Sequence, residues 1–107
     1  VRIFIAQIGD LAKKKCLGLF EEFRKNNIYV SESFGRDSIK AQLRVADRLS
    51  ADLALIIGQK EALDETVILR EMQSGTQEII PLTKIVDAVK KRLKKIHPRT
   101  IANGNNS

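Results

Sequence analysis

Apolar residues gather in five short segments that have the length and composition of β-strands. The first alternates along the chain and is rich in β-branched and aromatic side chains, as strands are. The third, DLALII, is almost continuously apolar, which is typical of a central parallel strand covered on both faces. We expect strands at residues 1–6, 28–31, 52–57, 66–70 and 77–80, the last two joined by a hairpin with Gly75 near its tip.

Three longer segments repeat apolar residues at helical spacing and predict amphipathic helices at residues 11–25, 38–49 and 83–97. Asp10, Thr83 and either Asp37 or Ser38 can cap their first turns. The expected buried faces are Ala12, Cys16, Leu19, Phe20 and Phe23; Ile39, Leu43, Ala46 and Leu49; and Val86, Val89, Leu93 and Ile96.

The resulting order of elements is β-α-β-α-β-β-β-α. Two βα units followed by a third strand require right-handed crossovers and parallel neighbours, and the hairpin then adds an antiparallel strand. We therefore expect an α/β fold with three layers, α/β/α, around one mixed five-stranded sheet. A single domain is expected over residues 1–96, followed by a flexible tail over residues 97–107. Because residue 1 is not Met and falls inside the first strand, we expect the chain to be cut from a longer protein or to start mid-chain.

The net charge of +6 is confined to one region. Seven of the 19 lysine and arginine residues lie between residues 84 and 99, where Asp87 is the single acidic residue. The rest of the chain carries twelve basic and twelve acidic residues and is neutral overall. A basic final helix is compatible with nucleic-acid binding, but we favour a solvated helix face whose charges complement the helix dipole, because blocks of like charge are common near chain ends.

Signatures of catalysis and of cofactor binding are absent from the sequence. It contains neither G-x-x-x-x-G-K-[ST] nor G-x-G-x-x-G, which bind nucleotide phosphates, and no C-x-x-C. Cys16 falls on an apolar helix face, where a small buried residue is the simplest interpretation. His97 has no cluster of possible metal ligands around it in sequence. We expect no catalytic residue, no metal, no cofactor and no membrane segment, in a reducing, cytoplasmic setting.

Polar residues follow the predicted parallel strands at the end where ligands of open α/β sheets bind. They are Gln7, Arg36, Gln59, Lys60 and Glu61; the aromatic Phe34 lies in the same predicted loop as Arg36, and Arg70 lies on the next strand. We expect Lys60, Glu61 and Arg70 to meet near one sheet edge, where donors and an acceptor can read the edges of unstacked bases. Phe34 either plugs the sheet edge or stacks on a base. A solvated turn is the alternative for Lys60 and Glu61.

Four stretches resemble the C-terminal anticodon-binding domain of class II aminoacyl-tRNA synthetases, and most of all that of the histidyl-tRNA synthetases. They are FGRDSIKAQLRVAD at residues 34–47, ALIIGQKE at 54–61, TVILR at 66–70 and SGTQE at 74–78. The resemblance covers residues 1–95. A Pro is usual in the family where residues 6–7 are Ala and Gln here, so the contribution of Gln7 differs from the family pattern.

The resemblance implies that Arg36, Lys60, Glu61 and Arg70 contact anticodon bases. It also implies a tRNA partner, and a parent chain whose separate catalytic domain uses ATP and Mg²⁺ in a homodimeric ligase. The alternative is a non-catalytic protein-interaction or accessory subunit built on the same fold. A flavodoxin-like nucleotide enzyme is disfavoured by the missing phosphate loop.

Overall fold

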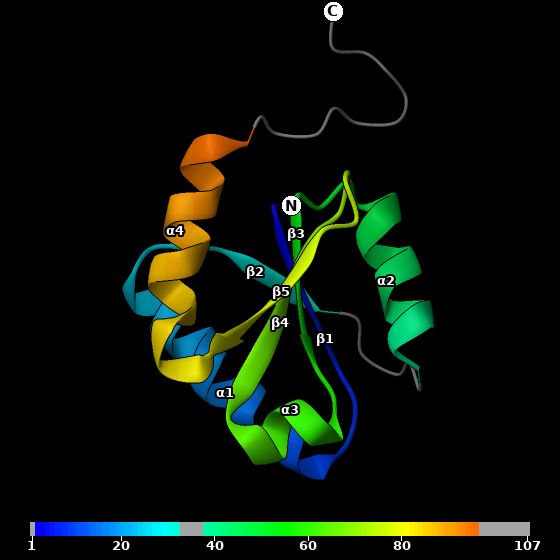
Figure 1. Ribbon diagram of the computed structural model, residues 1–107, viewed down its shortest axis with the longest axis vertical. Coiled ribbons are helices and arrows are strands. Elements are labelled where there is room, and N and C mark those ends of the chain that lie inside the picture. The colour runs from blue at the N-terminus through cyan, green and yellow to red at the C-terminus, as the bar shows by residue number, and fades with distance from the viewer. Residues whose placement is uncertain (1, 33–37, 97–107) are drawn as a thin grey trace, which may run out of the picture.

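The computed structural model describes residues 2–32 and 38–96, which form one five-stranded sheet with helices on both faces (Figure 1). The strand order is β2-β1-β3-β4-β5. β1, β2 and β3 are parallel, β4 is antiparallel to β3, and β5 is antiparallel to β4. The strands are β1 (Ile3–Gln7), β2 (Val30–Glu32), β3 (Leu53–Ile57), β4 (Thr66–Glu71) and β5 (Gln77–Pro81). The predicted mixed sheet and three layers are confirmed.

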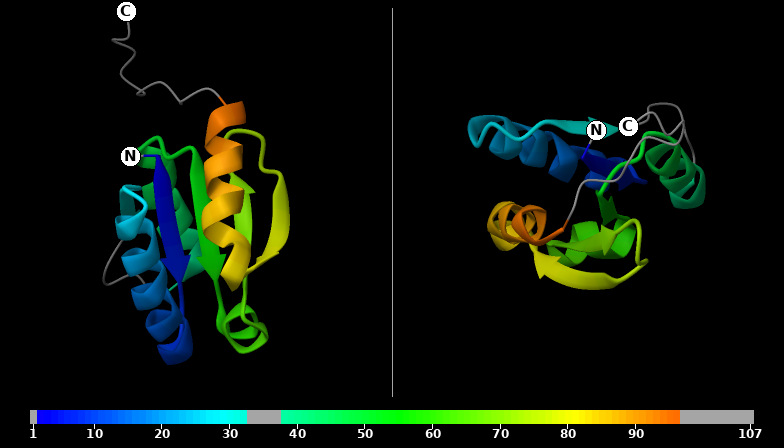
Figure 2. Two further views of the ribbon diagram at one scale, coloured as in Figure 1. Left: turned by 90° about the vertical axis from the view of Figure 1, so that its left-hand side faces the viewer. Right: turned by 90° about the horizontal axis from the view of Figure 1, so that it is seen from above.

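Helices α1 and α4 cover one face of the sheet, and α2 covers part of the other (Figure 2). The short α3 follows β3 and is an additional helix, because the predicted order of elements has none between the third and fourth strands. The helices are α1 (Asp10–Lys25), α2 (Ile39–Arg48), α3 (Gln59–Asp64) and α4 (Ile85–Lys95), with a 3-10 turn at Leu82–Lys84. None of the helices in the described part of the chain is long and apolar enough to cross a bilayer.

The helix starts confirm one predicted cap and correct two. The Ser38 hydroxyl accepts a hydrogen bond from the Ala41 N–H at 3.0 Å, as expected of a cap. Before α1 the cap position is held by Gly9, whose φ of 103° a side-chain-bearing residue rarely adopts, and Asp10 is already inside the helix. Thr83 lies in the 3-10 turn, so α4 starts two residues later than predicted.

The core has two layers, one on each face of the sheet, and β3 contributes to both. Leu53, Leu55 and Ile57 pack toward α1 and α4, whereas Ala54 and Ile56 pack toward α2. All five residues of β3 are buried, as the continuous apolar run predicted. The first-helix prediction also holds, because its expected face packs into the core. Two details of the other helices differ from the prediction. Leu49, expected on the buried face of the second helix, is 43% exposed. Ile85, which was not expected on the buried face of the last helix, is fully buried.

Gln42 is a buried polar residue that the hydrophobic pattern could not identify. Among the described residues, β2 ends at Glu32, opposite Ile5, so no described strand pairs with the backbone of Gln7 on that side. The Gln42 amide pairs with it instead: its Oε1 accepts from the Gln7 N–H at 2.9 Å and its Nε2 donates to the Gln7 carbonyl at 2.7 Å. Because Gln42 is 1% exposed, these two bonds attach α2 to β1 out of contact with water.

Replacing Gln42 with Met, which has a similar shape, should leave both Gln7 groups unpaired and lower the free energy of unfolding by about 2 kcal/mol. Urea unfolding followed by circular dichroism measures this change. Gln73→Met, at an exposed turn position, is the matched control and should change stability by less than about 0.5 kcal/mol. Equal midpoints for the two variants would contradict the role assigned to Gln42.

Cys16 is buried in the core layer under α1, as the sequence predicted. Desolvation, with a smaller contribution from the charge of Glu32, raises the pKa of its thiol to about 12. At pH 8 the thiolate fraction of such a group is about one in ten thousand, and it is near one in ten for the unfolded chain. Thiol-reactive dye should therefore label the native chain at least about 100-fold more slowly than the chain in urea; comparable rates would contradict this burial.

Candidate nucleic-acid interface

The carboxyl end of β3 leads directly into α3, which carries three of the predicted site residues. Gln59 and Lys60 are exposed and Glu61 is partly exposed. Glu61 Oε1 accepts a hydrogen bond from the Gly58 N–H at 2.8 Å and so caps the start of α3. A Cβ at position 58 would lie 3.0 Å from that oxygen, so a larger residue there would displace the Glu61 carboxylate. One carboxylate oxygen of Glu61 is thus held by the helix start, and Oε2 remains as an acceptor.

Lys60 points its ammonium along the outside of α3. Its Nζ donates to Asp64 Oδ2 at 2.9 Å, and this hydrogen bond raises the pKa of Lys60 above its usual value, so the group stays charged at neutral pH. The side chain is 82% exposed. Exposed pairs of this kind contribute little stability, so Lys60 can exchange Asp64 for an anionic ligand at small cost.

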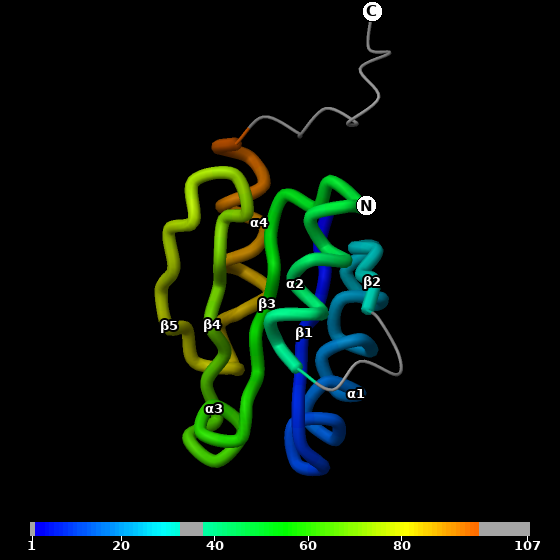
Figure 3. Tube along the Cα trace, turned by 90° about the vertical axis from the view of Figure 1, so that its right-hand side faces the viewer, coloured from blue at the N-terminus to red at the C-terminus, as the bar shows by residue number. Residues whose placement is uncertain are grey.

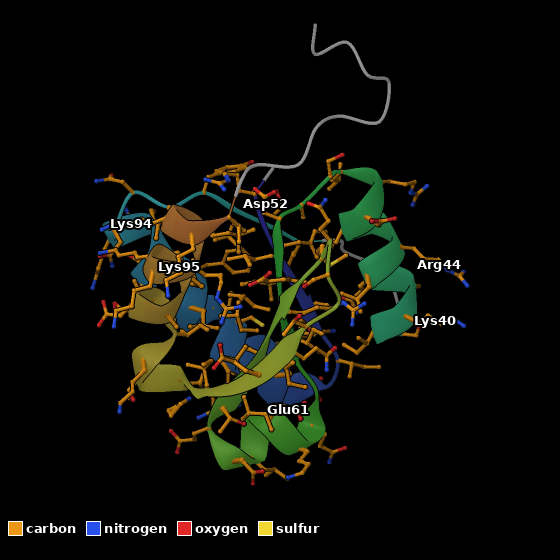
Figure 4. The ribbon with its side chains drawn as sticks, turned by 45° about the horizontal axis from the view of Figure 1, so that its top comes forward. Lys40, Arg44, Asp52, Glu61, Lys94 and Lys95 are labelled. Atoms are coloured by element: carbon orange, nitrogen blue, oxygen red, sulfur yellow. The ribbon has the colours of Figure 1, made fainter. Side chains whose placement is uncertain are left out.

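Arg70 does not lie beside Glu61, and the prediction that the two share one sheet edge is wrong. β4 runs antiparallel to β3, so Arg70 pairs with Ala54, near the start of β3. Ala54 lies about 10 Å along β3 from Ile57, and α3 begins shortly after Ile57. Glu61 and Arg70 therefore occupy opposite ends of the β3–β4 pair, and Figure 4 shows Glu61 at the α3 end.

Arg70 belongs instead to an uncovered part of the sheet. In the described part of the chain, α2 contacts β1 and β3, and no helix covers the same face of β4 and β5 (Figure 3). We call this surface the open face; it is formed by Ile68, Arg70, Gln77 and Ile79. Ile79, which pairs with Ile68 across the strands, is 67% exposed.

The open face combines an unused donor with an apolar platform. Arg70 Nη1 donates to Gln77 Oε1 at 2.9 Å, whereas its Nε is buried and has no hydrogen-bond partner among the described residues. A buried donor without an acceptor is unfavourable, and a ligand oxygen would satisfy it. Exposed aliphatic surface beside a guanidinium fork suits a planar base that carries carbonyl acceptors.

Gln7 lies at the carboxyl end of β1, as predicted, but on the other face. Its side chain lines a cavity of about 310 Å³ under α1, together with Cys16, Phe20 and Glu32. The Gln7 side-chain oxygen is buried and lacks a partner within residues 2–32 and 38–96. The structure therefore separates Gln7 from Arg70 by the thickness of the sheet. Phe34 and Arg36 lie outside the described residues, as does the predicted tail.

Sequence reasoning missed Gln77 and Ile79, although a signal for both was present. Once Gly75 is placed at the hairpin tip, the register sets Arg70 opposite Gln77, and period-two alternation then puts Ile79 on the same face. Basic residues Lys40 and Arg44 are exposed on α2, which borders the open face, and Figure 4 shows them directed away from the sheet. No group of three potential metal ligands occurs in the part of the chain that the structure describes.

Comparison with known proteins gives a consistent result. The family model described as "Anticodon binding domain" matches residues 1–92. Histidine–tRNA ligases from Dehalococcoides mccartyi and a Geobacillus strain are 35% and 36% identical over 91 and 90 residues, or 85% and 84% of this chain. These stretches are only 22% and 21% of the two ligases, so the chain spans about a fifth of their length.

Solved structures show the same similarity in three dimensions. Apo histidyl-tRNA synthetase from S. aureus is 30% identical, with a TM-score of 0.74, over 82% of this chain and 26% of that one. The enzyme from Nostoc sp. PCC 7120 shares the fold at 24% identity and a TM-score of 0.79, over 87% of this chain and 22% of that one. With the family model matching residues 1–92, this chain belongs to the anticodon-binding domain family of the class II aminoacyl-tRNA synthetases.

Proposed function

We propose that this chain recognises the anticodon of a tRNA as the C-terminal part of a histidine–tRNA ligase. The observation that carries the proposal is membership of the anticodon-binding family over residues 1–92, with the identity to histidine–tRNA ligases described above. On this proposal the chain binds RNA, and a separate catalytic domain of the parent ligase, which uses ATP and Mg²⁺, performs aminoacylation. The parent works in the cytoplasm as a homodimer.

The open face and the start of α3 form two halves of one recognition surface. An anticodon loop whose bases are unstacked extends over several nucleotides, so Arg70 on β4 and Glu61 in α3, which begins more than about 10 Å along β3 from the level of Arg70, can each meet a different base. This replaces the single cluster that the sequence suggested. Arg36 and Phe34, which lie outside the described residues, are proposed as further contacts to the anticodon loop.

The available donors and acceptors suit guanine, which the histidine anticodon GUG contains twice. The Watson–Crick edge of guanine presents N–H donors, and the second carboxylate oxygen of Glu61 accepts from them. Arg70 donates to a base carbonyl through the Nη2 group that Gln77 leaves unused. Lys60 and Gln59, both exposed, donate to neighbouring carbonyl or phosphate oxygens.

A Glu61→Gln variant tests the guanine contact more cleanly than Glu61→Ala, because glutamine can still accept from the Gly58 N–H and keep α3 capped. It replaces the acceptor offered to guanine by a donor. Affinity for a fluorescent GUG stem-loop should fall by about 1–3 kcal/mol, and affinity for the same stem-loop with adenines in place of the guanines should fall less. Fluorescence anisotropy titration measures both.

Glu65→Gln, on an exposed residue that follows the same helix, is the matched control and should bind the GUG stem-loop like the unmodified chain. Equal losses for the two RNAs with Glu61→Gln would remove Glu61 from base recognition. An unmodified chain that binds neither RNA but associates with a protein partner would contradict anticodon recognition and favour the accessory-subunit alternative.

A further inference from the structure

A groove runs between α4 and the outer strand β5, on the face of the sheet opposite the open face. It encloses about 460 Å³. Ile80, Pro81 and Ala88 contribute apolar floor, and the walls are charged. The charged residues that line it are Glu78, Lys84, Asp87, Lys91, Arg92 and Lys95.

The positive charge of this groove is only partly neutralised. Arg92 is bound on both sides: Nη1 donates to Glu71 Oε2 at 2.7 Å, and Nη2 donates to Glu78. Those two carboxylates are therefore occupied. Lys84, Lys91 and Lys95 are exposed, and within the described residues no ion pair is formed by any of them. Asp87 is the remaining acidic group, so the three lysines exceed the unpaired carboxylates in the groove.

β5 connects this groove to the open face, because successive side chains of one strand point to opposite faces. Gln77 and Ile79 lie on the open face, and Glu78 and Ile80 lie on the groove side of the same strand. β5 is also the last strand of the sheet, so no further strand separates the two surfaces (Figure 2). A ligand that reaches around the edge of β5 touches both.

We propose that Lys84, Lys91 and Lys95 form a phosphate-binding rail that holds the backbone of the anticodon stem while its loop lies on the open face. This inference rests on the proposed function, since it takes the RNA to be the same molecule. The rail extends about 16 Å from Lys84, which directly precedes α4, to Lys95 at the end of that helix, enough to meet several phosphates of one strand. Lysine ammonium groups on flexible stems accept many phosphate geometries and read no sequence.

The test compares two double variants of the 107-residue chain with equal loss of charge. K91Q/K95Q removes two rail lysines. K13Q/K14Q removes two exposed lysines of α1, which packs over the β1–β2 side of the sheet, away from β5. Both are titrated with the GUG stem-loop and with its adenine-substituted form, at several salt concentrations.

K91Q/K95Q should weaken binding of both RNAs by the same factor, about tenfold at low salt, and should make the plot of log affinity against log salt shallower by about 1 to 2. K13Q/K14Q should change neither quantity by more than about twofold. Circular dichroism of each variant should match that of the unmodified chain, because all four lysines are exposed.

The inference is overturned if K91Q/K95Q binds both RNAs like the unmodified chain, which would leave the groove to a protein partner. It is also overturned if the two double variants lose affinity equally, since attraction would then follow total charge. A different result would contradict the proposed function. If the unmodified chain binds the GUG stem-loop and its adenine-substituted form with equal affinity, it does not recognise the anticodon, even if K91Q/K95Q weakens binding of both RNAs as the rail predicts.

Discussion

The buried central strand β3 is the constraint on which the arrangement of this protein depends. All five of its residues lie in the core, with β1 parallel on one side and β4 antiparallel on the other. Because the chain reverses direction at β4, the residues that follow β3 and the residues that end β4 are sent to opposite ends of the sheet. The candidate contacts to RNA are consequently spread along the β3–β4 pair, and a ligand must be extended to meet them.

The small residues of the α2 layer determine how much of the sheet remains accessible. This layer is built largely from alanines, at positions 6, 46, 51 and 54. Its two large buried side chains are Phe4, which is fully buried, and Ile56, which is nearly so. The one short helix on this layer, α2, contacts β1 and β3. Two bonds from Gln42 to the Gln7 backbone fix the position of that helix. The open face of β4 and β5 is thus a result of core packing as much as of surface sequence.

Much of this fold followed from the sequence, because it depends on hydrophobic periodicity. The DLALII run identified the buried central strand, and Ser38 was correctly identified as a cap because its short side chain suits that position. The predictions failed at two local features. Gly9 takes the cap position of α1, and the Gln42 side chain forms hydrogen bonds with the backbone of Gln7. Neither depends on a repeating pattern, so periodicity could not show them.

The candidate site was predicted less well for a geometric reason. Proximity in the sequence located Gln59, Lys60 and Glu61 correctly after β3, but Arg70 required the hairpin register and the direction of β4 to be combined. An edge strand normally carries features that discourage further pairing, and β5 has Glu78 and the terminal Pro81. Ile79 on the same strand is 67% exposed, as single apolar side chains on protein surfaces often are. Its importance for the proposed function comes from its position, because it lies opposite Ile68 on the same face of the sheet as Arg70 and Gln77.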